Sequence, residues 1–491
     1  MTALGELGTL EASGLIEIVA LQPELEYLFR HAMVQEAAYG SLLKQDRRKL
    51  HLVAAETILS LHPERARELA GVIAMHFEQA GAATRAADHL VVAGDHALER
   101  FANKEAAAFF ARAGALADET QVDLRLRAAI GATKAGWTYN ESGSDIDRLE
   151  AALAGADHAD PRLVTEAYFW VAFLRRQRAE VPESSPALRY ALERGAEIGT
   201  ALGDPNAGAL PKAFMGSFNA FTGHLREGAE EMREALDSLE AKGDPVSTAM
   251  VSDFLAMTYA RLGDFAAADE MLARSKRLAG EGDDIARVDV LIAGSAIHLE
   301  RGELDQASAQ SLLCSTRSEE LGALACVVAA NVMFGAASLG LDDAPAAMRP
   351  LERSSELALV TNMAPMRTLI RGLLGSVRAQ LGDLPGGVAD WDEALGAARA
   401  MGDRFGEAQT LWRRARTLTG QAMPDWTAAL SDLERAIELF ESMETRPSLA
   451  RALHDRGQAL RALGRIDESA ESERRSRELG QQLGLKDLAF A

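Results

Sequence analysis

The chain has 491 residues, of which 48% are hydrophobic and only 5% aromatic, and its 52 basic against 73 acidic residues give a net charge of −21. Because this length exceeds what one closed core usually holds, we expect several domains or an array of repeats. The negative charge repels phosphate backbones, so we expect no nucleic-acid binding by the chain itself. The sequence has no long apolar run, which argues against a membrane span. The opening residues lack the basic stretch of a signal peptide. Cys314 and Cys326 are expected to be buried free thiols. Both observations favour a cytoplasmic location.

Residues 1–50 carry the β signal of this chain. Leu15–Val19 and Glu26–Phe29 alternate in polarity and are separated by the turn residues Gln22 and Pro23, which predicts two short strands. A helix is expected from about His31 to Leu43. Helix, two-stranded wing and helix indicate a partial winged-helix-like segment.

Residues 51–200 are expected to form irregular helical pairs. Proline, glycine and asparagine interrupt this region, and residues 120–200 are interpreted as two imperfect pairs. The helices predicted before residue 120 are His51–Leu61, Glu64–Ala80, Ala83–Phe101 and Lys104–Ala117.

Residues 201–491 are expected to form regular repeats, because a glycine or glycine-like break returns about every 40 residues. This series consists of Gly203, Gly243, Gly282, Gly322, Asn362, Gly402, Glu444 and Gly484. A second series lies midway and consists of Gly223, Gly263, Gly302, Gly340, Gly382, Gly420 and Gly464. Two breaks per period leave room for two helices of roughly 16 residues, so we predict an all-α fold, an α-solenoid of helix pairs.

A second pattern follows the mid-repeat glycine. The second residue after it is large in most repeats, as in Leu225 and Phe265, and the fifth is small, as in Gly228, Ala268 and Ala307. A small residue one turn after a large one lets two helices approach closely. Two repeats deviate: Asp342 and Pro345 replace the motif after Gly340, and Trp426 and Ala429 carry it after a slip of four residues beyond Gly420.

The repeat pattern resembles the tetratricopeptide repeat in a longer variant of about 40 residues. The stretch Tyr27–Tyr39, with Ser41–Leu43 and Arg47–His51, resembles a junction in signal-transduction ATPases with numerous domains, in their adenylate cyclase-linked and LuxR-type regulators. The likeness continues through Ala74–Gly81 and Ala93–Ala97 to about residue 115. The resemblance implies a winged helix that follows a nucleotide-binding module and precedes helical repeats.

The sequence departs from that family in one respect that bears on function. It contains no Gly-x-x-x-x-Gly-Lys-Ser/Thr loop, so we expect no nucleotide hydrolysis, and an ATPase or cyclase half would lie upstream of Met1. It also contains no His-Glu-x-x-His motif and no Gly-x-Ser-x-Gly elbow. We therefore expect no catalytic residues, no cofactor and no metal, and a protein that is not an enzyme.

The candidate binding surface is the concave face, which the first helix of each pair is expected to line. Polar and aromatic residues recur there at positions 4, 7 and 11 before the mid-repeat glycine. The residues at position 4 are Asn219, Tyr259, His298, Arg378 and Arg416; those at position 11 are Lys212, Ser252, Arg371 and Gln409; those at position 7 are Ser295 and Arg413. One interpretation is a solvated face. The other is a peptide groove whose basic end, Arg371, Arg378, Arg413 and Arg416, meets an acidic partner segment.

Two functions follow from these alternatives. The first is a non-catalytic regulatory scaffold in signal transduction, which binds a protein partner or its own missing ATPase or cyclase half through the concave face. The second is the small-effector sensor domain of a transcriptional regulator or cyclase. A protein partner predicts a broad, polar, arginine-bearing groove, whereas an effector predicts an enclosed pocket lined by apolar and aromatic residues.

Overall fold

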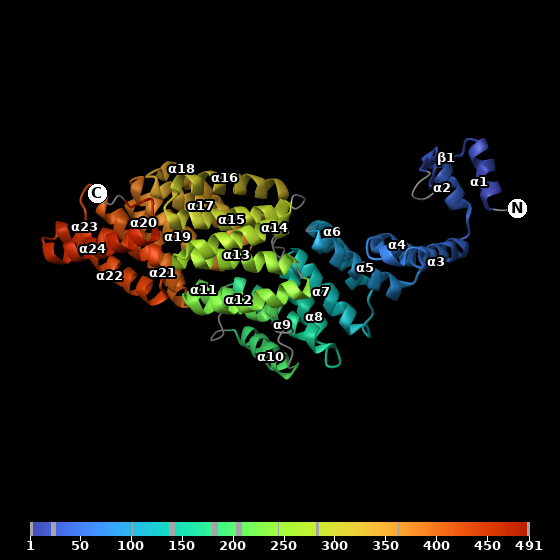
Figure 1. Ribbon diagram of the computed structural model, residues 1–491, viewed down its shortest axis with the longest axis horizontal. Coiled ribbons are helices and arrows are strands. Elements are labelled where there is room, and N and C mark those ends of the chain that lie inside the picture. Colours follow the sequence, from blue (N-terminus) through green and yellow to red (C-terminus); the bar gives the residue numbers. More distant parts are fainter. Residues whose placement is uncertain are drawn as a thin grey trace. The chain divides into compact units, whose positions relative to one another are not determined.

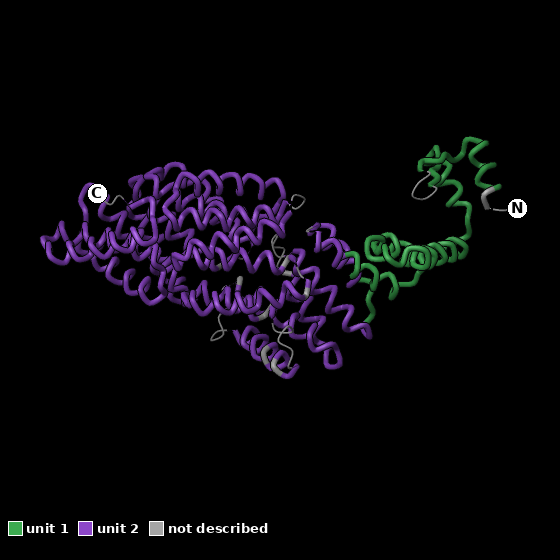
Figure 2. The backbone as a smooth tube through the Cα atoms, viewed as in Figure 1, with its two compact units in different colours: residues 1–93, 115–118 green, residues 94–114, 119–491 purple. Residues whose placement is uncertain are grey.

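The computed structural model describes residues 3–20, 26–100, 102–136, 143–178, 185–202, 209–243, 245–280, 284–361 and 363–488. These residues form an all-α protein with one small β-hairpin, as predicted (Figure 1). The chain separates into two compact units, residues 1–93 with 115–118 and residues 94–114 with 119–491 (Figure 2). The boundaries predicted at residues 50 and 200 separate a winged-helix-like segment, irregular helical pairs and regular repeats, and they stay predictions. Within the described ranges, no helix is both long and apolar enough to cross a lipid bilayer.

The first unit holds the two predicted strands. They pair antiparallel, with Ile16 opposite Phe29, and the predicted turn residues Gln22 and Pro23 lie outside the described residues. Ile73 and Phe77 are fully buried and join helices α3 and α4 in a small core. The elements in chain order are α1 (Ala3–Ala12), β1 (Ile16–Ala20), β2 (Glu26–Phe29), α2 (Ala32–Ser41), α3 (Lys44–Leu61), the 3₁₀ turn η1 (Pro63–Arg65) and α4 (Ala70–Ala80).

Six further helices lie between α4 and the regular repeats in the described part of the chain. They are α5 (Ala83–Glu99), α6 (Asn103–Leu116), α7 (Val122–Gly136), α8 (Gly143–Leu153), α9 (Pro161–Gln177) and α10 (Pro186–Leu202). Within the second unit, α9 contributes Trp170 and Phe173 to an aromatic cluster that Phe214 of α11 (Ala209–Thr222) completes. The helices predicted before residue 120 are present, although α3 begins seven residues before the predicted His51 and α4 six residues after the predicted Glu64. Four helices, α7 to α10, occupy the region after residue 120 where two imperfect pairs were predicted.

The regular repeats consist of seven helix pairs. Their helices are α11 (Ala209–Thr222), α12 (Leu225–Lys242), α13 (Pro245–Leu262), α14 (Phe265–Ala279), α15 (Asp284–Arg301), α16 (Leu304–Leu321), α17 (Leu324–Gly340), α18 (Ala344–Val360), α19 (Ala364–Gln380), α20 (Leu384–Met401), α21 (Arg404–Thr419), α22 (Trp426–Met443), α23 (Arg446–Ala462) and α24 (Ile466–Leu483). Each odd-numbered helix is the first of its pair, and each even-numbered helix is the second.

The predicted breaks between pairs are confirmed where the structure describes them. Gly243, Gly322, Gly402 and Gly484 end their helices in the left-handed backbone conformation. Glu444 does the same with a φ of 58°, so the glycine-like role predicted for it is correct. Three members of that series, Gly203, Gly282 and Asn362, lie outside the described residues.

One predicted break is in the wrong place. Helix α17 continues through Gly340, and Asp342 is the residue with positive φ, 59°, before α18 begins at Ala344. An aspartate tolerates this conformation better than most residues, since its side chain is short and polar. Counted from Asp342, the small position of the motif is the buried Ala347, whereas Ala344 stands where most repeats have a large residue.

The two helices of a pair meet at small residues. The seventh position before the break is Gly216 in α11 and Gly375 in α19, and a Cβ on either would lie 2.6 Å from an atom of the second helix. The atoms are the carbonyl oxygen of Gly228 and the indole ring of Trp391. The same position is small in the other first helices, with Ala256, Ser295, Gly335 and Gly457. The face around this position is therefore the contact between the helices of one pair.

The array of first helices returns on itself. Helix α23 contacts both α13 and α15, and α21 contacts α11. The side chains of Arg226 on α12 and Glu444 at the end of α22 form an ion pair, which adds a contact across the same junction. The inner faces of the first helices consequently look onto a shared space.

Candidate functional site

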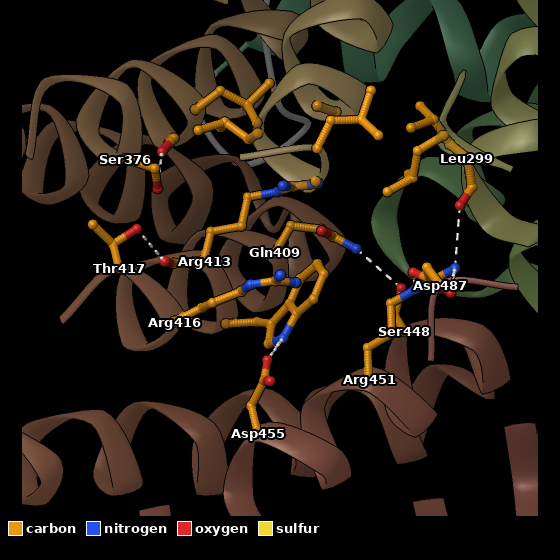
Figure 3. A pocket seen from close by; sticks show the side chains of 18 of the residues that line it. Leu299, Ser376, Gln409, Arg413, Arg416, Thr417, Ser448, Arg451, Asp455 and Asp487 are labelled. Carbon is orange, nitrogen blue, oxygen red and sulfur yellow. Dashed lines mark hydrogen bonds and ion pairs between the residues drawn. The ribbon is translucent and has the colours of Figure 1, made fainter. Parts of the chain in front are cut away.

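The first helices enclose a cavity of about 1060 Å³. Its wall is formed mainly by α13, α15, α17, α19, α21 and α23, together with residues 486–488 of the C-terminal segment (Figure 3). The sixth position before the break faces this cavity in five of these helices. The residues there are Met257, Ala296, Ala336, Ser376 and Gln458. Position 9 joins it in α17, α19 and α23, and position 13 in α19 and α23, whereas the predicted positions 4, 7 and 11 do not line the cavity in these five helices.

Several predicted site residues face the second helix of their own pair instead. Asn219 donates from Nδ2 to Glu231 at 2.8 Å, and Arg371 and Arg378 each lie within 3 Å of the Asp390 carboxylate. Positions 4 and 11 flank position 7 on one helical face, and position 7 is where the two helices touch. The polar residues predicted for the groove therefore pair within the hairpin.

The remaining predicted residues outside the cavity have similar local roles. His298 Nδ1 lies 2.6 Å from a carboxylate oxygen of Glu303, just beyond the end of its own helix. Tyr259 is half-buried, and burial raises the pKa of its hydroxyl. The others form local polar contacts: Lys212 with Glu234, Ser252 with the carbonyl of Thr248, and Ser295 with the carbonyl of Leu291.

Three predicted residues do line the cavity, namely Gln409, Arg413 and Arg416 of α21. A longer loop follows helix α21. The mid-repeat breaks at Asp342 and Gly382 are 40 residues apart, and the same spacing places the break of the next repeat at position 422 rather than at Gly420. Counted from 422, the three residues occupy positions 13, 9 and 6, which are also the inward positions of α19 and α23. The structure thus divides the four predicted arginines, and the single basic wall expected from the sequence does not form.

Arg413 has an unusual electrostatic environment. Among the described residues no carboxylate forms an ion pair with its guanidinium, whose central carbon lies 5.1 Å from the ring centroid of Trp412. Burial, and then the nearby charges of Arg416 and Arg451, lower the pKa of Arg413 to about 10. The nearby Glu300 charge opposes that shift, so this half-buried guanidinium is partly balanced by a carboxylate beyond ion-pair distance.

The opposite side of the cavity is closed by internal hydrogen bonds. Arg451 donates to Asp487 at 2.5 Å and to the backbone carbonyl oxygens of Leu299 at 3.2 Å and Glu300 at 2.9 Å (Figure 3). Burial raises the pKa of Glu300, although the Arg451 charge opposes that shift. These groups hold α23, α15 and the C-terminal segment together.

Two further polar contacts tie α21 to α23. Trp412 Nε1 donates to the Asp455 carboxylate at 2.7 Å, and Gln409 Nε2 donates to the Ser448 hydroxyl at 3.0 Å (Figure 3). The sequence reasoning missed Arg451, Asp455 and Asp487. The small residue recurring at position 7 could have located Arg451 and Asp455, because it marks the contact between the two helices of a pair and leaves the other side of the first helix to face inward. Asp487 lies beyond the last helix, and no repeat pattern points to it.

The structure offers no arrangement typical of a metal centre. Within the described part of the chain, no group of three or more histidine, cysteine, aspartate or glutamate side chains is placed to hold a metal ion. Cys314 and Cys326 are buried and unbridged, and burial raises the pKa of each thiol.

Comparison with known proteins identifies the fold. No protein-family model matches the chain, and no curated protein matches it. The crystal structure of Rap protein complexed with Competence and Sporulation Factor is 13% identical with a TM-score of 0.56, and the match covers 74% of this chain and 99% of that chain. The APC/C hetero-tetramer Cut9-Hcn1 is 13% identical with a TM-score of 0.48, covering 90% and 86%. The Rap conjugation gene regulator of plasmid pLS20 with the Phr* peptide is 10% identical with a TM-score of 0.47, covering 72% and 95%. The chain is thus a tetratricopeptide-like helical-repeat protein.

Proposed function

We propose that the repeats form a non-catalytic regulatory receptor, which binds a short segment of a protein partner in the cavity between the first helices. The observation that carries this proposal is the convergence of six first helices on one cavity of about 1060 Å³. A surface built by so many repeats offers an extended set of contacts to one ligand, as solenoid proteins use their concave faces.

The lining favours a peptide over a drug-like effector. Small-molecule pockets typically enclose about 300–1,000 Å³ and are lined mainly by apolar and aromatic side chains. This cavity lies slightly above that range, and Gln409, Arg413, Arg416 and Gln458 are among its lining residues. Amide and guanidinium groups of this kind suit the amides and charges of a polypeptide.

The fold supports the same proposal in general terms. The Rap protein that matches with a TM-score of 0.56 is complexed with Competence and Sporulation Factor, and that statement concerns the Rap protein alone. For this chain we propose only that the shared arrangement of helix pairs serves binding of a polypeptide. The finer proposal, that the partner is an ATPase or cyclase half in a signalling pathway, rests on the resemblance of residues 27–115 to signal-transduction ATPases.

A cavity-filling variant tests the proposal. Ala336 faces the cavity from α17, so Ala336→Trp would occupy ligand space, while the exposed Ala309 on α16 provides a matched control as Ala309→Trp. The purified full chain is dialysed against a pool of random hexapeptides and, separately, a pool of small organic metabolites, and bound species are identified by mass spectrometry.

We expect the parent and Ala309→Trp to retain peptides and Ala336→Trp to lose at least about tenfold of that retention. Retention of metabolites instead of peptides, with the same dependence on Ala336, would favour the effector sensor. Retention of neither pool, or retention that is equal in both variants, contradicts binding in the cavity.

A further inference from the structure

The alternating direction of the helices gives the regular repeats two different edges. Each first helix ends where its second helix begins, so the turns within the pairs follow one edge, which we call the turn edge. The connections between successive pairs follow the opposite edge, which we call the link edge. The turn edge contains Gly223, Gly263, Gly302, Gly382 and Gly464. The link edge contains the last residues of the second helices, among them Val360, Met443 and Leu483.

The turn edge of the first pairs is covered by the later part of the same chain. A Cβ on Gly223 would lie 2.7 Å from the sulfur of Met443, and a Cβ on Gly263 would lie 2.7 Å from a side-chain carbon of Leu483. The third turn, at Gly302, contacts the C-terminal segment. The superhelix therefore closes through a seam, in which the turn edge of early pairs receives the link edge of late pairs.

The seam buries apolar side chains from both edges. Leu225, two residues after Gly223, is only 1% exposed and belongs to the same hydrophobic cluster as Phe405 of α21 and Met443 of α22. Met443 itself is 2% exposed. Removing such surface from water is the main source of stability at a contact of this kind. The apolar residues beside the turns thus serve the contact between edges.

The turn edge continues beyond the seam, where the described residues leave it uncovered. A Cβ on Gly382 or Gly464 would meet no described atom within 4 Å. The positions equivalent to Leu225 hold Leu384, which is 36% exposed, and Ile466, which is 59% exposed. The exposed apolar residues of this stretch, none of which lines the cavity, are Leu381, Leu384, Met423, Leu463 and Ile466.

The link edge also has an exposed apolar end. Val360 is the last residue of α18, which is the position that Met443 holds in α22 and Leu483 holds in α24. Those two residues fill the seam, whereas Val360 is 69% exposed and its neighbour Leu359 is 61% exposed. The end of α18 therefore has the position and the apolar character of a seam residue, but it faces solvent in the single chain.

We propose that the exposed turn edge of the last three pairs binds the end of α18 in a second copy of this chain. The contact would continue between molecules the seam that already exists within one molecule, and it would cover apolar side chains that a single chain leaves in water. Because the seam joins unlike edges, the copies associate head to tail. Such an association leaves one free edge at each end, so it grows with protein concentration.

The test uses full-length variants that place a charge on one edge at a time. Ile466→Glu changes the turn edge and Val360→Glu changes the link edge, while Leu312→Glu, at a 55% exposed position in the middle of α16, is the control on neither edge. Leu463→Glu and Leu359→Glu repeat the two changes at neighbouring exposed positions. Sedimentation velocity is measured from low to high micromolar concentration, and thermal unfolding verifies that each variant keeps the melting temperature of the parent.

We expect the parent and Leu312→Glu to form larger species as the concentration rises. Ile466→Glu and Val360→Glu should each associate at least about tenfold more weakly, because a buried unpaired charge opposes the contact. An equimolar mixture of the two variants should form dimers and stop there. In that mixture the intact turn edge of Val360→Glu meets the intact link edge of Ile466→Glu, and no further pair of intact edges remains.

Four results would overturn the proposal. The first is a parent that stays monomeric at every concentration, and the second is an association that neither edge variant weakens. The third is an association that Ile466→Glu abolishes and Val360→Glu leaves intact, since the turn edge would then pair with itself. The fourth is a mixture of the two variants that stays monomeric. Peptide binding in the cavity is a separate question, because none of the changed residues lines it.

Discussion

Arg451 on α23 donates from Nη2 to the backbone carbonyl oxygen of Glu300 on α15 at 2.9 Å, which joins residues 151 positions apart in the chain. The same guanidinium binds the Asp487 carboxylate at 2.5 Å. One side chain therefore connects the third and the last first helix of the regular array with the C-terminal segment. The cavity has a closed side because of this junction.

Arg451→Ala should destabilise the repeats by about 3–5 kcal/mol, because it leaves the buried Glu300 and Asp487 carboxylates without their cation. Urea unfolding measures the change. The exposed Arg465, paired with Glu468 on the surface of α24, provides the control as Arg465→Ala, for which we expect a much smaller effect. Hydrogen exchange should rise first at the ends of α15 and α23. Equal effects of both variants would show that the Arg451 junction is no stronger than a surface pair.

Asp253→Asn should stabilise the protein at neutral pH. Asp253 is buried on α13 with one carboxylate oxygen that has no hydrogen-bond partner, and burial, followed by the nearby Asp289 charge, raises its pKa well above the usual range. A carboxyl group whose pKa is raised in the folded state favours folding below its unfolded pKa and loses that contribution as the pH rises through the folded value. The stability of the parent should therefore fall between about pH 4 and neutral pH more than that of Asp253→Asn.

Melting temperatures across this pH range measure the difference. Asp237→Asn, at an exposed position of α12, should follow the parent. Parallel curves for the parent and Asp253→Asn would contradict the raised pKa as the source of the pH dependence.

Ala268→Leu should overpack the contact between α13 and α14 and cost about 1–3 kcal/mol, since Ala268 is fully buried at the small position of its repeat. Coupling between neighbours should spread the effect to the adjacent repeats more than to the first unit. Hydrogen exchange can follow this gradient, with Ala266→Leu at an exposed site of the same helix as the control. A uniform rise in exchange over the whole chain is the result that would count against a repeat array.

Arg378→Glu should lower the melting temperature, with a loss of about 1–3 kcal/mol, whereas Arg416→Glu should leave it nearly unchanged. Arg378 lies 2.9 Å from the buried Asp390, so reversal would place two carboxylates together, while Arg416 has no ion pair to lose among the described residues. Thermal unfolding compares the two reversals directly. If both variants melt alike, the assignment of Arg378 to the hairpin and of Arg416 to the cavity is wrong.

The sequence by itself predicted the elements of the fold. The strands at Ile16–Ala20 and Glu26–Phe29 and the breaks at Gly402 and Glu444 all lie where local residue patterns placed them. Such features depend on backbone preferences and on the periodicity of apolar residues within a few turns. The misplaced break at Gly340 has the same local origin, because Asp342 takes the left-handed conformation that was assigned to a glycine.

Only the tertiary structure decided which side of each first helix faces inward and where the array closes. Arg378 and Arg416 were counted at the same repeat position, yet one pairs with Asp390 and the other lines the cavity. The reason is the longer loop after α21, which places Gly420 two residues before the true reference position of that repeat. The contact of Arg451 with Glu300 depends on the accumulated rotation of all the repeats between them. The periodicity of residues within one helix carries no information about this accumulated rotation. The cavity and the residues that line it could therefore be identified only from the tertiary structure.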